Sequence, residues 1–246
     1  MTRRMKFTWI GGPSFLLETG AFRILGDPVF SDSVESPQAV RNGERPDVDV
    51  QSVDVVCLSC LRGDHFDPAL GQHISPTAPV ITQPRTADRI RGAGLHDVRE
   101  LGWHHEIRME KGGEVLTVRA VPARSGSGDD NGYYFRHEVG GTHYTAYCTG
   151  DAIWSEEVRQ IQQELGYVNL LIQFLGAEGG RGQLTSPDAK EAMQFVYRMQ
   201  PNAIVAVHHS TFSHYTESIT PFMENVGRTI YDKRLHLLRE GDSLEK

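Results

Sequence analysis

The sequence predicts an α/β protein in which two β-sheets pack as a sandwich with helices on the outer faces. Two observations support this prediction. Up to residue 150, short apolar runs are separated by turn-forming residues, which is typical of consecutive strands. After residue 150, segments with helical periodicity alternate with short apolar runs, which gives the order helix, strand, helix, strand, helix.

The strand-rich part begins close to the amino terminus, where Gly11-Gly12-Pro13 and Thr19-Gly20 supply turns between the first three strands. A polar loop over 31–48 has little pattern and is placed where it could overhang a site. The predicted strands are 6–10, 14–18, 22–25, 53–58, 79–82, 97–101, 115–121, 133–137 and 143–148.

Two of the helices predicted in the later part can be assigned to residues. Apolar residues spaced four, three and four apart predict a helix from Trp154 to Leu165. A second helix is predicted after Ser186-Pro187, an N-cap and first-turn pair, with its apolar face running over 189–199. The apolar runs 168–175 and 203–207 predict buried strands. No linker or repeat divides the chain, so residues 1–246 are expected to form one domain.

Composition and charge exclude several classes of partner. A net charge of −7 argues against a protein that binds nucleic acid by neutralising phosphates. No apolar run approaches the roughly 20 residues of a membrane span. The basic amino terminus lacks the apolar core of a signal peptide. We therefore expect a small-molecule substrate, no nucleic acid or membrane partner, a cytoplasmic location, and an oligomeric state that the sequence leaves open.

Two of the three cysteines, Cys57 and Cys60, form a C-x-x-C spacing that is typical of redox pairs. The alternative is a set of buried, unreactive thiols. The second interpretation is favoured, because Cys57 lies inside an apolar strand run and no helix follows the pair.

The segment that follows the strand run 53–58 places a carboxylate and an imidazole side by side, at Asp64 and His65. It resembles the metal-binding signature of the metallo-β-lactamase superfamily, in which a strand leads into histidine, any residue, histidine, any residue, aspartate and histidine. Cys60 and Arg62 occupy the first two histidine positions here, whereas Asp64 and His65 match the signature.

Further segments resemble the branch of that superfamily that contains ascorbate-6-phosphate lactonase and the N-acylethanolamine-releasing phospholipase D. They come in family order over nearly the whole chain, and the resemblance therefore implies the αββα sandwich fold. The matching segments are Thr8-Trp9-Ile10-Gly11, Phe15-Leu16-Leu17-Glu18, Ile24-Leu25-Gly26-Asp27-Pro28, Pro122-Ala123-Arg124-Ser125-Gly126, Asn131-Gly132-Tyr133, Cys148-Thr149-Gly150-Asp151 and 204–212.

One of the two metal sites of the family is altered in this chain. The family binds that metal with three imidazoles, whose positions here hold Cys60, Arg62 and Ser125. Gly12 also replaces a histidine that this branch usually places beside the site. The resemblance therefore implies that this ion is lost.

The second metal site of the family is retained. Its aspartate and histidines correspond to Asp64, His65 and His208, and the carboxylate that bridges two metals corresponds to Asp151. The resemblance thus implies one divalent metal, which is zinc, manganese or iron, bound by these four residues. His209 is adjacent to His208 and should point the opposite way on an extended segment, so the family spacing selects His208.

The altered positions suggest roles of their own. We expect Arg62 to replace the lost cation, by holding Asp151 or an anionic substrate group with its guanidinium fork. The alternative is an Arg62 that points outward. Cys60 could be a soft ligand, a nucleophile or an apolar filler. Together with Asp64 and Asp151, Arg62 forms the predicted catalytic set.

Contacts with the substrate are assigned to Cys60, Ser125 and His209. Glu178 and Arg181 lie in a glycine-rich loop after the buried strand 168–175, so they either line the cleft or belong to a plain surface loop. His214 is interpreted as a surface or core residue.

Three functions fit this pattern. The first is a metal-dependent hydrolase of a small ester, lactone or phosphorylated metabolite. The second is a mononuclear non-haem iron enzyme with a non-hydrolytic reaction, since two histidines and a carboxylate resemble the facial triad. The third is a catalytically silent relative that binds a ligand.

Overall fold

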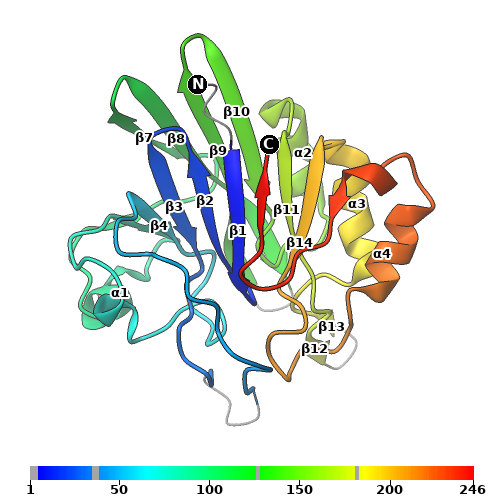
Figure 1. Ribbon diagram of the computed structural model, residues 1–246, viewed down its shortest axis with the longest axis horizontal. Helices are drawn as coiled ribbons and strands as arrows, with labels where there is room; N and C mark the ends of the chain where they lie inside the picture. Colours follow the sequence, from blue (N-terminus) through cyan, green and yellow to red (C-terminus); the bar gives the residue numbers. More distant parts are fainter. Residues whose placement is uncertain (1–4, 35–38, 126–127, 181–182) are drawn as a thin grey trace.

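The computed structural model describes residues 5–34, 39–125, 128–180 and 183–246, and it contains two seven-stranded sheets that pack face to face (Figure 1). The first sheet comprises β1 (Met5–Gly11), β2 (Ser14–Thr19), β3 (Phe22–Gly26), β4 (Val55–Cys57), β5 (Val80–Thr82), β6 (Val98–Glu100) and β16 (Ser243–Glu245). The second comprises β7 (Glu106–Lys111), β8 (Glu114–Ser125), β9 (Gly128–Val139), β10 (Thr142–Cys148), β11 (Leu170–Phe174), β14 (Ala203–Val207) and β15 (Leu235–His236).

The strand orders are β16-β1-β2-β3-β4-β5-β6 and β15-β14-β11-β10-β9-β8-β7. In the first sheet, β3, β4, β5 and β6 run parallel, and in the second sheet β10, β11, β14 and β15 do. A short hairpin is formed by β12 (Gly179–Gly180) and β13 (Gln183–Leu184). The predicted two-sheet sandwich is confirmed.

Alternation along the strands explains why the sheets pack on both faces. In β2, Phe15 and Leu17 point into the core between the sheets, while Leu16 joins the apolar cluster on the outer face. Ile90 of α1 (Ala87–Gly92) belongs to that outer cluster. The first sheet is therefore covered on its outer side by α1 and the loops around it.

The outer face of the second sheet is covered by α2 (Glu156–Leu165), α3 (Ala189–Met199) and α4 (Thr220–Gly227) (Figure 1). The structure adds two 3-10 turns, Leu70–Gln72 and Asp232–Arg234. In the described ranges, no helix combines the length and the apolar character needed to cross a membrane.

The predicted start of α3 is wrong by two residues. Asp188 is the N-cap, because its carboxylate accepts a hydrogen bond from the Glu191 amide at 2.7 Å. The hydroxyl of Ser186 instead accepts from the amide of Glu178 at 2.9 Å. Ser186 therefore anchors the loop that approaches the site.

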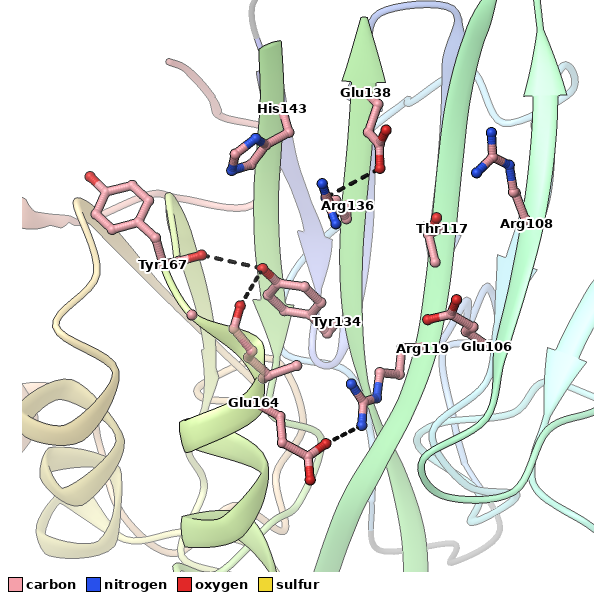
Figure 2. Close-up of a pocket in the computed structure, with 12 residues that line it drawn as sticks. Glu106, Arg108, Thr117, Arg119, Tyr134, Arg136, Glu138, His143, Glu164 and Tyr167 are labelled. Atoms are coloured by element: carbon pink, nitrogen blue, oxygen red, sulfur yellow. Dashed lines mark hydrogen bonds and ion pairs between the residues drawn. The ribbon is translucent and has the colours of Figure 1, made fainter. Parts of the chain in front are cut away.

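Helices do not cover the whole outer face of the second sheet, and the remaining part carries a hollow of about 450 Å³ beside α2 (Figure 2). Arg119 pairs with Glu164 across it, and Arg136 lies 3.2 Å from Glu138. The hydroxyl of Tyr134 donates to the carbonyl of Leu165 at 2.9 Å. These pairs of opposite charge are typical of a solvated sheet face.

Asp67 fastens the loop after β3 to the segment that follows β4. Its carboxylate accepts hydrogen bonds from the amides of Phe30, Ser31 and Ala69 at 2.8–2.9 Å, and from the Ser31 hydroxyl at 2.9 Å. Asp67→Ala leaves these buried donors without partners, so we expect the free energy of unfolding to fall by about 3 kcal/mol. Denaturant titration measures it. Asp88→Ala, at an exposed aspartate, is the control and should change it by less than about 0.5 kcal/mol.

Candidate metal site

The candidate site begins in the loop that follows β4. The amides of His65 and Phe66 both donate to the carbonyl of Arg62 at 3.0 Å, which closes a tight turn. The turn directs the side chains of Asp64 and His65 inward, where both are buried. The local sequence thus presents a carboxylate and an imidazole from adjacent residues at the end of a buried strand.

The His65 ring is oriented by partners on its far side. Its Nδ1 lies 3.1 Å from Oδ2 of Asp27 and 3.0 Å from the Ser59 hydroxyl, while the Ser59 amide donates to Asp27 at 2.6 Å. A proton on Nδ1 that is donated to Asp27 leaves the Nε2 lone pair facing Asp151, whose Oδ2 is 3.2 Å away. This carboxylate–histidine arrangement is the one that orients metal ligands.

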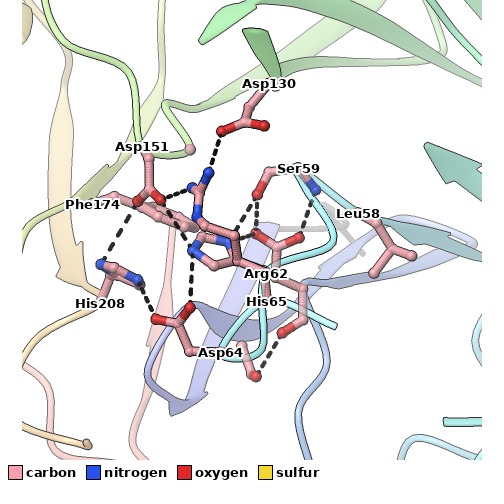
Figure 3. A network of polar contacts seen from close by, with 12 residues as sticks. Leu58, Ser59, Arg62, Asp64, His65, Asp130, Asp151, Phe174 and His208 are labelled. Atoms are coloured by element: carbon pink, nitrogen blue, oxygen red, sulfur yellow. Dashed lines mark hydrogen bonds and ion pairs between the residues drawn. The ribbon is translucent and has the colours of Figure 1, made fainter. Parts of the chain in front are cut away.

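His208 follows β14 and is oriented in the same way. Its Nδ1 donates to the carbonyl of Leu175 at 2.7 Å, so Nε2 faces Oδ2 of Asp64 at 2.9 Å (Figure 3). The residue has φ of +61°, a left-handed conformation that is strained for a side chain of this size. A hydrogen bond of 2.7 Å from its amide to the carbonyl of Gly12 holds it there.

The charges of the cluster depend on one another. Burial lowers the pKa of His65 and of His208, but neighbouring negative charges, among them Asp64 and Asp151, outweigh it and raise both pKa values. Burial raises the pKa of Asp64 and of Asp151, yet the imidazoles lower both below the usual range. His65 and His208, whose raised pKa values favour the protonated form, would release protons on binding a divalent cation, whereas Asp64 and Asp151 are already ionised.

The donor set fits a metal ion. Ligand atoms of Asp64, His65 and His208 lie within 4.8 Å of one another, and all three residues are buried. Among the described residues, His65 Nε2 and Asp151 Oδ1 are buried without a hydrogen-bond partner. Two imidazoles with two carboxylates suit zinc, manganese or ferrous iron. The four residues predicted as metal ligands are thus brought together from three separate segments, since Asp64 and His65 are adjacent.

Arg62 points into the cluster, which excludes the outward-pointing alternative. Its Nη1 lies 2.7 Å from Oδ2 of Asp130, and its Nη2 binds Oδ2 of Asp151 (Figure 3). The side chain is only 29% exposed. Nothing in the sequence pattern indicated Asp130. It reaches Arg62 because β9 passes beside the loop that carries Ser59. The Asn131 amide donates to the Ser59 carbonyl at 2.9 Å and holds the two segments together.

Glu178 and His214 lie close to Asp64 and extend the cluster. Nε2 of His214 lies 3.2 Å from Asp64 Oδ2 and 3.2 Å from Glu178 Oε1. The hydroxyl of Tyr215 donates to Asp64 at 3.4 Å. The interpretation of His214 as a surface or core residue was therefore wrong. Arg181, the other charged residue predicted in the glycine-rich loop, lies outside the described residues. A histidine only six positions after His208 was the available signal.

The residues predicted to contact substrate lie in three different settings. Cys60 is buried close to His65, and burial raises its thiol pKa to about 11, which favours an inert filler over a nucleophile. All three cysteines are free. Ser125 is the last residue of β8. His209 is not brought into the cluster, because its ring packs on Trp9 with centroids 4.6 Å apart. Substrate contact by these residues stays a prediction.

The family model described as the beta-lactamase superfamily domain matches residues 22–209, which is most of the chain. The chain belongs to the β-lactamase superfamily. The predicted metallo-β-lactamase fold is confirmed by this match.

Relatives within the superfamily span the chain to different extents. A metal-dependent hydrolase of Methanopyrus kandleri is 24% identical over 98% of this chain and 100% of its own length. An uncharacterised protein of Mycobacterium tuberculosis is 26% identical over 85% of this chain, and the match spans only 59% of that longer protein. Among solved structures, an isothiocyanate hydrolase from Delia radicum gut bacteria superimposes with a TM-score of 0.81 at 20% identity, covering 98% of each chain. That likeness concerns the fold.

Proposed function

We propose that the protein is a metal-dependent hydrolase of the lactonase-like branch, which uses one divalent ion held by Asp64, His65, Asp151 and His208. Arg62 takes the place of the second cation. The observation that supports this most is the bond between Arg62 and Asp151, because the family resemblance makes Asp151 the carboxylate that would otherwise bridge two metals. Relatives named as metal-dependent hydrolases over almost the whole chain agree with it.

A charge count supports a single ion. One divalent cation neutralises the carboxylates of Asp64 and Asp151, and Arg62 neutralises Asp130. A buried cluster of this kind is stable only when its charges are compensated, and these groups compensate one another without a second metal. A guanidinium cannot be deprotonated, so the compensation persists at any working pH.

The residues around the ion have separable tasks in hydrolysis. When bound, the metal polarises a carbonyl or phosphoryl oxygen and lowers the pKa of a water. Asp151 Oδ1, a buried carboxylate oxygen without a hydrogen-bond partner among the described residues, would be the acceptor for a proton of the attacking water. Arg62 donates to the oxyanion that develops on the substrate. A small ester, a lactone or a phosphorylated metabolite suits these tasks.

Elemental analysis of purified protein is expected to find about one equivalent of zinc, manganese or iron per chain. Removing the ion with a chelator should abolish hydrolysis, and adding it back should restore hydrolysis. A matched variant, Cys60→His/Arg62→His/Ser125→His, restores the three imidazoles of the family and should raise the metal content to about two equivalents. Two equivalents in the unmodified protein would contradict the proposal.

A second candidate is a mononuclear iron enzyme, which is favoured by the cluster of Asp64, His65 and His208, because it has the two imidazoles and one carboxylate of a facial triad. Purification without oxygen separates the two candidates. Bound ferrous iron with turnover that requires oxygen would select the iron enzyme. Less than about a tenth of an equivalent of any metal would select the silent ligand-binding relative.

A further inference from the structure

A cleft of about 410 Å³ opens beside Arg62, and Asp64 is not among the residues that line it. Its lining includes three arginines, Arg62, Arg85 and Arg89. The size is within the range of small-molecule sites. The cleft therefore offers a route by which part of a substrate could reach the guanidinium that touches the metal cluster.

The lining of this cleft is strongly positive for an acidic protein. Asp130 is its one carboxylate among the described residues, and that carboxylate already pairs with Arg62 at 2.7 Å. Arg85 and Arg89 also line the cleft, in a chain whose net charge is −7. A concave surface of one charge sign concentrates ligands of the opposite sign.

The backbone of Arg85 and the side chain of Arg89 are each constrained by the fold. Arg85 has φ of +69°, a conformation that costs energy for any residue other than glycine and that is concentrated at functional sites. Arg89 extends from α1, with its guanidinium carbon 5.5 Å from the ring centroid of Phe66. Phe66 follows His65 directly, so Arg89 packs on the loop that supplies the predicted metal ligands Asp64 and His65.

A neighbouring hollow of about 420 Å³ shares Gln83 and Arg85 with the cleft and adds the indole of Trp103. The Trp103 ring is fixed by a hydrogen bond of 2.8 Å from its indole nitrogen to the Asp130 carbonyl. Arg124 lies over the ring at 5.4 Å. The hollow therefore provides a flat apolar wall next to the positive cleft.

We infer that the cleft lined by Arg62, Arg85 and Arg89 is a subsite for an oxyanion, either the carboxylate or the phosphate group of a small substrate. Arginine forks match both groups with paired hydrogen bonds. The body of the substrate extends over Trp103. Identifying the bound oxyanion as part of a substrate rests on the proposed function. Binding of the oxyanion itself can be tested without turnover.

Calorimetry at constant ionic strength tests the inference. It measures the binding of inorganic phosphate and of acetate to the metal-loaded protein. One of the two anions should bind saturably, and the preferred one assigns the substrate as a phosphoryl or a carboxylate compound. Arg85→Ala and Arg89→Ala should each weaken binding about tenfold, which corresponds to about 1.4 kcal/mol. Arg91→Ala, on the same helix but outside the cleft and paired with Asp88, should change it less than twofold.

Absence of saturable binding of both anions, or equal weakening by Arg91→Ala and Arg85→Ala, overturns the inference in favour of a general charge effect. The metal content is measured in the same samples. Anion binding by a protein that carries no metal would retain the subsite and reject the proposed hydrolase. A full equivalent of metal without anion binding would reject the subsite alone.

Discussion

Replacing His208 with alanine is expected to remove the metal, whereas replacing its neighbour His209 with alanine is expected to leave the metal in place. Nε2 of His208 faces Asp64 at 2.9 Å, and its Nδ1 is held by the Leu175 carbonyl. The His209 ring packs on Trp9 instead. Loss of one of four ligands should lower metal affinity at least about 100-fold, since loss of an outer-shell partner alone costs 10–100-fold.

The two variants are well matched, because both remove a buried imidazole from adjacent positions of the same loop. Metal content by elemental analysis and the melting temperature of each variant after chelation separate ligand loss from unfolding. Equal metal content in both variants would contradict the assignment of His208. Loss of metal from His209→Ala, with a folded protein, would show that the two imidazoles have been assigned in the wrong order.

Arg62→Ala is expected to lower the rate of hydrolysis by about 10²–10³-fold while the protein keeps its metal. The substitution removes the donor assigned to the developing oxyanion, and such donors are typically worth this factor. It also leaves Asp130 and Asp151 without their shared cation. Because the Arg62 side chain is 29% exposed and water screens part of the lost interaction, we expect the free energy of unfolding to fall by only about 2 kcal/mol.

Steady-state kinetics, elemental analysis and denaturant titration of Arg62→Ala measure these three effects separately. Arg62→Lys keeps the charge but cannot bridge Asp130 and Asp151 with a planar fork. Relative to Arg62→Ala, it should therefore recover more of the free energy of unfolding than of the rate of hydrolysis. Arg99→Ala removes an arginine whose side chain is 40% exposed and which, within the described ranges, pairs with Asp97, and it should leave all three quantities unchanged. A rate in Arg62→Ala equal to that of the unmodified protein would exclude a catalytic Arg62.

The strands that could be predicted from the sequence are those with buried apolar residues. β7 was missed, because four of its six residues are charged and only Ile107 and Met109 turn toward the core. β15 and β16 contain two and three residues, too few to show any period. α1 was missed for a similar reason, since its six residues contribute only Ala87 and Ile90 to the interior. The secondary structure of short elements at the edge of a sheet is determined by packing against neighbouring strands and not by the apolar pattern of their own residues.

The predicted metal ligands came from a family resemblance, and the partners of those ligands did not. Asp130 and His214 meet the cluster only because strands distant in sequence bring their loops together. No spacing rule relates them to Asp64. The contact between Arg62 and Asp151 was one of two expectations, and it combined the family resemblance with charge compensation, because removing a cation from a buried pair of carboxylates leaves a repulsion that another cation must relieve.

Gly12 stands at a position where a larger side chain would not fit. The family resemblance places a histidine there, but Gly12 has φ of +55°, and a Cβ on it would lie 3.0 Å from the Phe212 ring and 3.1 Å from the Tyr215 hydroxyl. A histidine at this position would therefore meet both backbone strain and steric overlap. It could be accommodated only if Phe212 and Tyr215 were changed first, so the order in which substitutions are introduced decides which of them the fold tolerates.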